Sequence, residues 1–197
     1  MESVKTQQTI GEVDFRRTII SLTNLKTGEA RSLAFTDIEG RVNDIRIATS
    51  APEDVQNLLV TAKNLLLYSW FYYPFSVTAA LQASMAIERA LRLKLAAQPK
   101  DTLTHLLRRA IQDGLITDAG FPRWKEYIEA FQCIHSLRKG SKKKLTLTTI
   151  LLDTFPKFRN AIAHGGPLLD DLGFRHLDIA AEVILQLYPD TKASSPQ

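Results

Sequence analysis

The sequence contains a single cysteine, Cys133, among its 197 residues. One cysteine cannot form an intramolecular disulfide, so a disulfide-stabilised secreted fold is excluded and a cytoplasmic protein is expected. The N-terminal residues lack a basic start followed by an apolar run, which argues against a signal peptide. The longest apolar stretch, residues 64–77, is too short to cross a bilayer and contains Pro74. We therefore expect no membrane association.

Several kinds of catalytic motif are also missing. His105, His135 and His176 do not combine with Cys133 or with carboxylates at a spacing that suits a metal site. The chain has no glycine-rich phosphate loop and no nucleophilic serine motif. We therefore expect neither a metal ion nor a cofactor.

The chain does contain enough hydrophobic residues to form a core. Hydrophobic residues make up 45% of the sequence, and the formal net charge is +4. This composition predicts one globular domain with a sizeable core and a small appendage. The positive charge is a weak indication of an anionic partner, because many proteins without such a partner are equally basic.

Residues 1–50 are predicted to form an N-terminal arm and a β-hairpin. The arm covers residues 1–15, and β-prone runs follow at residues 18–23 and 30–35. Between the runs, Thr27-Gly28 suits a turn with positive φ. Residues 40–51 could add a third strand or form a loose turn. An isolated hairpin is only marginally stable, so it should pack on the helical body or on a partner.

Residues 51–190 are predicted to form a helical domain, followed by a disordered tail at 191–197. Ser50 to Asp54 is a typical helix start, with an N-cap residue, a proline and acidic residues in the first turn. Asp101 is the predicted N-cap of the third helix, and Gly114 its stop. The apolar periodicity predicts an all-α antiparallel bundle, with helices at about 52–72, 74–97, 101–113, 121–138, 145–155 and 173–187.

The most informative motif joins Arg159, Asn160 and His164, and it is followed by Gly165-Gly166. It follows Pro156, where the preceding helix is expected to kink or restart, so the motif is predicted to form one short helix. Asn160 and His164 are four residues apart and so share a face. The opposite, core-facing side is predicted to hold Phe155, Phe158 and Ile162.

This arrangement of side chains suits a phosphodiester. Arg159 is a permanent cation, and the imidazole of His164 titrates near neutrality. RNA supplies its own nucleophile, the 2′-hydroxyl, so cleavage needs a proton-transfer group and a cation but no metal. One motif provides only one histidine, and two facing motifs would fill the acid and base roles more easily, which favours a homodimer. The plainer alternative is that Arg159 forms a structural salt bridge and His164 caps the helix.

The Arg-Asn-x-x-x-His motif late in an all-helical domain resembles the signature of the HEPN superfamily. This family includes metal-independent endoribonucleases of toxin–antitoxin and anti-phage systems, and members without demonstrated catalysis. The resemblance covers roughly residues 52–188. It implies His164 as the proton-transfer group, Arg159 as the phosphate stabiliser and Asn160 as the positioning amide, with 2′,3′-cyclic phosphate and 5′-hydroxyl products. It also implies RNA as substrate and an antitoxin partner of the nucleotidyltransferase type. The alternative is a non-catalytic HEPN-like module that binds a partner protein or a nucleotide.

Glu88 is a carboxylate within an apolar stripe. The residues of this stripe follow helical spacing, namely Val77, Leu81, Ser84, Glu88, Leu91 and Leu95. A buried carboxylate needs a cation or several donors. Two partners are equally plausible from the sequence: the motif residues Arg159 or Asn160, with Glu88 supporting the site, and Arg92 at i+4 on the same helix.

A basic cluster occupies residues 138–144. Most clusters of this kind are solvated loops, and that is the first interpretation. The alternative is that the cluster carries the RNA backbone past the active site, through Arg138, Lys139, Lys142, Lys143 and Lys144. The dense aromatic residues at 68–75 are expected to pack in the core or a dimer interface rather than to stack on bases.

Overall fold

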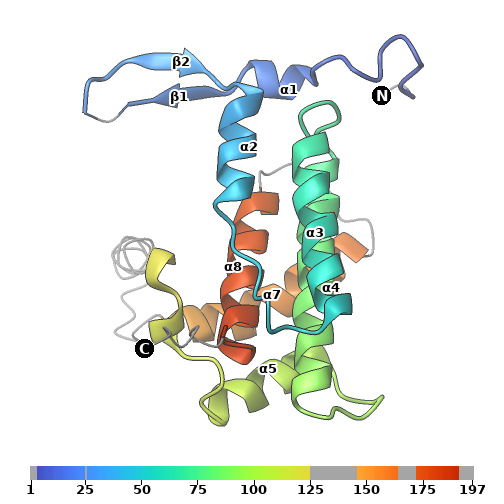
Figure 1. Ribbon diagram of the computed structural model, residues 1–197, viewed down its shortest axis with the longest axis vertical. Coiled ribbons are helices and arrows are strands. Elements are labelled where there is room, and N and C mark those ends of the chain that lie inside the picture. The colour runs from blue at the N-terminus through green and yellow to red at the C-terminus, as the bar shows by residue number, and fades with distance from the viewer. Residues whose placement is uncertain (1–3, 25, 125–145, 164–171, 191–197) are drawn as a thin grey trace, which may run out of the picture.

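A computed structural model describes residues 4–24, 26–124, 146–163 and 172–190. The described chain is predominantly helical with one small antiparallel hairpin, so the all-α prediction with a β appendage is confirmed (Figure 1). The predicted basic cluster and C-terminal tail lie outside the described residues. The elements are α1 (Phe15–Thr18), β1 (Ser21–Thr23), β2 (Ala30–Ser32), α2 (Phe35–Asn43), α3 (Glu53–Tyr68), α4 (Phe75–Lys94), α5 (Leu103–Gln112), the 3-10 turns η1 (Asp118–Gly120) and η2 (Pro122–Trp124), α7 (Leu147–Ala163) and α8 (Leu172–Leu187).

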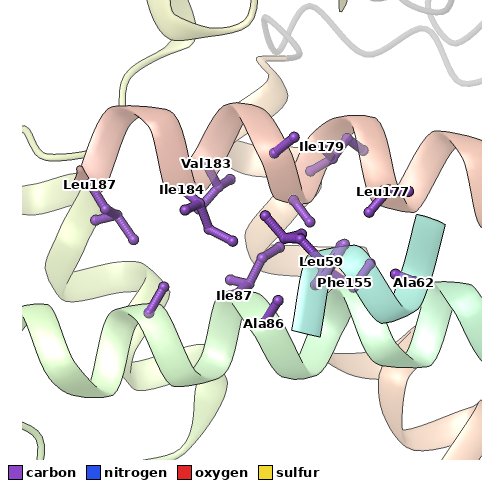
Figure 2. Packing of buried hydrophobic residues seen from close by; sticks show 14 of the residues in the cluster. Leu59, Ala62, Ala86, Ile87, Phe155, Leu177, Ile179, Val183, Ile184 and Leu187 are labelled. Carbon is purple, nitrogen blue, oxygen red and sulfur yellow. The ribbon is translucent and has the colours of Figure 1, made fainter. Parts of the chain in front are cut away.

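Helix α4 is the centre of the structure. It packs against both α3 and α8, and it also contacts α5 and α7 (Figure 1). Small side chains allow these neighbours to approach closely, because the buried positions of α4 include five alanines, Ala79, Ala80, Ala83, Ala86 and Ala90. Figure 2 shows the apolar side chains of α8 directed towards α4, with Leu59 of α3 and Phe155 of α7 between them. Burying each large aliphatic side chain contributes about 1.5–3 kcal/mol.

Among the described helices, none is both long enough and apolar enough to span a membrane. The longest, α4, has 20 residues, but these include Glu88, Arg89, Arg92 and Lys94.

The hairpin forms where it was predicted, although its strands are shorter than expected. Leu22 pairs with Arg31 in antiparallel register, and Gly28 in the connecting loop has φ of 76°. All six strand residues are exposed, and the hairpin projects away from the helices (Figure 1).

The residues that precede the hairpin are anchored to the turn between α3 and α4. Asp14 accepts hydrogen bonds from the Tyr73 backbone N–H at 2.9 Å and from the Arg16 side chain. Burial raises the pKa of Asp14, but the hydrogen bond from the Arg16 side chain and those from the Tyr73 and Arg16 N–H groups outweigh it, and the pKa falls to about 2. Arg17 is fully buried and donates to the Ser69 hydroxyl at 2.6 Å.

The prediction of a strand or loose turn at residues 40–51 is wrong at its beginning, because α2 extends from Phe35 to Asn43. Ile38, Val42 and Ile45 are buried, and their spacing of four and three residues is that of a helix. Asp37 stabilises the first turn, since its carboxylate accepts the Ala34 N–H at 2.8 Å. The β-prone run at 30–35 thus ends in the start of α2.

Two of the predicted helix starts also differ from the structure. Ser50 does not cap α3; its hydroxyl donates instead to the Tyr188 carbonyl, beyond the end of α8, at 2.8 Å. The N-cap of α5 is Thr102 rather than Asp101, and its side chain accepts the His105 N–H. Gly114, with φ of 71°, does end α5 as predicted.

The motif does not form a separate short helix. Pro156 lies inside α7, and the helix continues to Ala163. A proline within a helix removes one backbone hydrogen bond but does not require the helix to end. Arg159 and Asn160 are therefore held by a longer element, which packs against α4 and α5.

Candidate functional site

Helix α7 carries the motif, and its buried residues fix it to the core. Phe155 is buried as predicted, and its ring stacks on that of His176 from α8 at 5.2 Å between centroids. Arg159 is partly buried, whereas Asn160 is exposed. The side chains of Phe158 and Ile162 and all of His164 lie outside what the structure describes. The structure thus places two of the three motif residues.

Glu88 of α4 contacts two arginines at once. One carboxylate oxygen accepts from Arg92 at 3.0 and 3.2 Å, and the other lies 3.4 Å from Arg159 Nη2. Both pairings left open by the sequence are therefore present together. The side chain of Glu88 is 20% exposed, that of Arg92 29% and that of Arg159 36%, so the group is half-buried.

The carboxylate orients the Arg159 guanidinium. Nη2 faces Glu88, and Nη1 donates to the Asn160 side-chain oxygen at 3.3 Å. The Nε atom is shielded from solvent and has no hydrogen-bond acceptor within the described residues. The Arg159 side chain is 36% exposed, so another part of its guanidinium is open to an anion in the solvent.

Arg92 connects this group to the segment before α5. It donates to the carbonyl oxygens of Asp101 at 2.8 Å and Gln98 at 3.3 Å. The Asp101 carboxylate turns back on its own loop, where it accepts the Gln98 N–H at 2.8 Å and contacts His105 at 3.0 Å. The Gln98 N–H lowers the pKa of Asp101, against a smaller effect of burial, and His105 lowers it further.

A pocket of about 320 Å³ lies between α4, the start of α5 and α7. Its wall is about equally polar and apolar, and it contains three cationic side chains, those of Arg92, Lys100 and Arg159. The remaining lining residues are Glu88, Pro99, Asp101, Thr102, Leu103, Thr104, Pro156 and Asn160. The three cations face two carboxylates, so the pocket carries an excess of one positive charge and suits an anionic ligand.

The other candidate site residues considered from the sequence either lie outside the described residues or do not line this pocket. The basic residues Arg138, Lys139, Lys142, Lys143 and Lys144 lie outside the described residues, as do Cys133 and His135. His105 is exposed beside Asp101, and His176 is buried against Phe155. In the part of the chain that the structure describes, no group of three histidine, cysteine or acidic side chains could hold a metal ion.

Sequence reasoning overlooked Lys100 and Thr102 as parts of the site. Pro99-Lys100-Asp101-Thr102 has the appearance of an ordinary helix start, and only the packing of α5 against α7 brings it to Arg159. Arg92 was considered only as a competing partner for Glu88, whereas it lines the pocket together with Arg159.

A second group of ionisable residues lies on α8, away from this pocket. Asp178 and Glu182 line a cavity of about 290 Å³, and Asp178 lies 3.5 Å from Arg123 and 3.8 Å from Arg41. Burial raises the pKa of Glu182 to about 7, and the charge of Asp178 adds to this effect. Two acids four residues apart on a largely apolar helix were a signal that could have been read from the sequence.

Comparisons of the chain with protein-family models, with curated proteins and with solved structures give no significant match.

Proposed function

We propose that this protein is a metal-independent endoribonuclease that produces 2′,3′-cyclic phosphate and 5′-hydroxyl ends. The observation that carries the proposal is the Arg159 guanidinium, which Glu88 and Asn160 orient at a pocket with excess positive charge. The Arg-Asn-x-x-x-His motif, with its resemblance to the HEPN superfamily, supplies the titratable group, His164.

In the proposed reaction, the 2′-oxygen of the RNA attacks the adjacent phosphorus while the P–O5′ bond breaks. A histidine removes the 2′-hydroxyl proton, and an acid gives a proton to the departing 5′-oxygen. Arg159 stabilises the negative charge that develops on the phosphoryl oxygens, and Asn160 positions the phosphate. The base and acid are His164 from two protomers of a homodimer, because each motif contributes one imidazole.

The remaining parts of the proposal concern the setting. The basic cluster at 138–144 would bind the RNA backbone, and the protein would act in the cytoplasm in a toxin–antitoxin or anti-phage system. Its inhibitor would be an antitoxin of the nucleotidyltransferase type. The biological setting and the antitoxin follow from the resemblance of the motif to that family, whereas the role of the cluster rests on its charge and the location on the single cysteine.

The test is cleavage of single-stranded RNA by the purified protein in EDTA, with the ends identified by mass spectrometry. His164→Ala and Arg159→Ala should each lower the rate by about 10²–10⁴-fold, as for groups that act in the transition state. The matched control is Arg89→Ala: Arg89 also lies on a helix and pairs with Asp54, but it does not line the pocket. Cleavage at the parental rate by both motif variants would contradict the assignment.

Mixing tests whether the site is composite. If each site needs His164 from both protomers, an equal mixture of wild type and His164→Ala, allowed to exchange subunits, should retain about a quarter of the activity, because heterodimers are inactive. Retention of half would indicate that each protomer acts alone. Sedimentation should show a dimer at micromolar concentration.

A second candidate function is a module that binds a partner protein. The observation that favours it is the concentration of exposed apolar side chains near the N-terminus, among them Phe15 (68% exposed) and Ile19 (75% exposed). Nearby, an apolar pocket of about 570 Å³ is lined by both arm and aromatic residues, namely Val4, Lys5, Ile10, Gly11, Tyr68, Phe71, Tyr72 and Phe75. RNA cleavage lost in His164→Ala but kept in Phe15→Ser would favour the nuclease, whereas no cleavage by wild type would favour the module.

A further inference from the structure

The pocket at Arg159 extends further than one phosphate requires. Its far wall is formed by the residues before α5 and by the first turn of that helix, and it includes Lys100, Thr102 and Thr104. At about 320 Å³ it falls within the lower range of small-ligand sites. The far wall is therefore available for a group that adjoins the reacting phosphate.

The charges on this wall are only partly neutralised. Glu88 divides its carboxylate between Arg92 and Arg159, and the Asp101 carboxylate is engaged by the Gln98 N–H and by His105. Lys100 forms no hydrogen bond or ion pair with any described residue. Lys100 is exposed, and its charge also lowers the pKa of Asp101, whereas Arg92 is partly buried. Two cations on this wall, one of them partly buried, suit a phosphate.

The geometry also holds Arg92 in place. Its guanidinium is fixed by Glu88 on one side and by the carbonyl oxygens of Gln98 and Asp101 on the other. A cation that is already positioned loses little side-chain entropy when a ligand binds. Pro99 and Pro156 add apolar surface beside it, which suits a ribose.

We propose that this pocket binds the phosphate next to the cleaved one along the RNA chain, with Arg92 and Lys100 as its ligands. The inference rests on the endoribonuclease function proposed above and makes it more specific: the preferred substrate carries two consecutive phosphates. A dinucleoside monophosphate fills only the reacting position, and a second phosphate at one of its ends completes the site.

The experiment compares kcat/KM for a dinucleoside monophosphate with that for the same compound bearing a 5′- or a 3′-terminal phosphate. Wild type should prefer one of the phosphorylated compounds by about tenfold, the gain for one additional charge-assisted contact. Lys100→Ala and Arg92→Lys should each bring this ratio towards one. Arg89→Ala is the matched control, and its ratio should equal that of wild type.

Two further measurements keep the proposal testable if a variant folds poorly or no cleavage is seen. Arg92 donates hydrogen bonds to two backbone carbonyl groups, so its replacement can disturb the fold. Lys100 makes no such hydrogen bond, so Lys100→Ala tests the site in a folded protein. Affinity for 2′-O-methyl analogues with one or two phosphates, measured by calorimetry, does not depend on catalysis. A phosphate-dependent affinity lost in Lys100→Ala supports the site even if the nuclease proposal fails. Cleavage without any preference for the second phosphate overturns the site and leaves the nuclease proposal standing.

Discussion

Replacement of Glu88 by alanine removes the carboxylate shared by Arg92 and Arg159. An exposed ion pair contributes about 0.2–1 kcal/mol, and a hydrogen bond to a charged group that is removed from water contributes about 1.5–3 kcal/mol. The three side chains are between 20% and 36% exposed, so the stabilisation that Glu88 provides should lie between these two energies. We expect Glu88→Ala to lower the free energy of unfolding by about 1–2 kcal/mol, which corresponds to a Tm decrease of about 2–8 °C for a chain of this size.

Urea denaturation followed by circular dichroism measures the effect, and double-mutant cycles assign it. The coupling of Glu88 to Arg92 should be about 0.5–1 kcal/mol, because two donors lie within 3.2 Å. The coupling to Arg159 should be smaller, about 0.3–0.5 kcal/mol, since its single contact is 3.4 Å long.

The control pair is Arg109 and Asp113, which have the same i,i+4 spacing but are about half exposed, with 3.7 Å between their charged atoms. Their coupling should be below about 0.3 kcal/mol. If Glu88 couples to Arg159 no more strongly than the residues of this control pair couple to each other, the carboxylate does not orient Arg159, and the geometric argument for the site is refuted.

Three further predictions concern stability. Glu182 has its pKa raised to about 7 by burial and by Asp178, so the native state binds more protons than the unfolded state between about pH 4.5 and 7. The stability that the protonated Glu182 provides is lost as the pH rises through 7. Glu182→Gln should therefore flatten this part of the pH–stability curve and stabilise the protein at pH 8 by about 1–3 kcal/mol. An unchanged curve would contradict the assignment. The pKa of Asp14 is lowered to about 2, so its contribution is present above about pH 4 and is lost as the pH falls towards 2; Asp14→Asn should reduce that acid dependence in urea titrations. A Cβ at Gly173 would lie 2.5 Å from the Ser76 carbonyl oxygen, so Gly173→Ala should lower the free energy of unfolding by about 1–3 kcal/mol, and an unchanged Tm would show that α8 can move away.

Local patterns predicted much of the helical body. The apolar periodicity of α3, α4, α5 and α8 placed these helices to within a few residues of their observed bounds, since one face of each must be buried. The patterns predicted the wrong element where the same residues suit both a strand and a helix. Val42 and Ile45 suited a strand edge as well as a helix face, and α2 formed because Ile38 extends the helical spacing and Asp37 stabilises the first turn.

By itself, the sequence determined the fold class, the hairpin turn at Gly28 and the motif of Arg159, Asn160 and His164. These are local properties: apolar spacing, a backbone conformation open to glycine, and neighbouring residues on one helix. Only the tertiary structure decided which side chains meet. The packing of α4, α5 and α7 places Glu88 between Arg92 and Arg159 and brings Lys100 to the same pocket. Contacts between residues 71 positions apart in the chain depend on how several helices fill one core, and no local pattern encodes that choice.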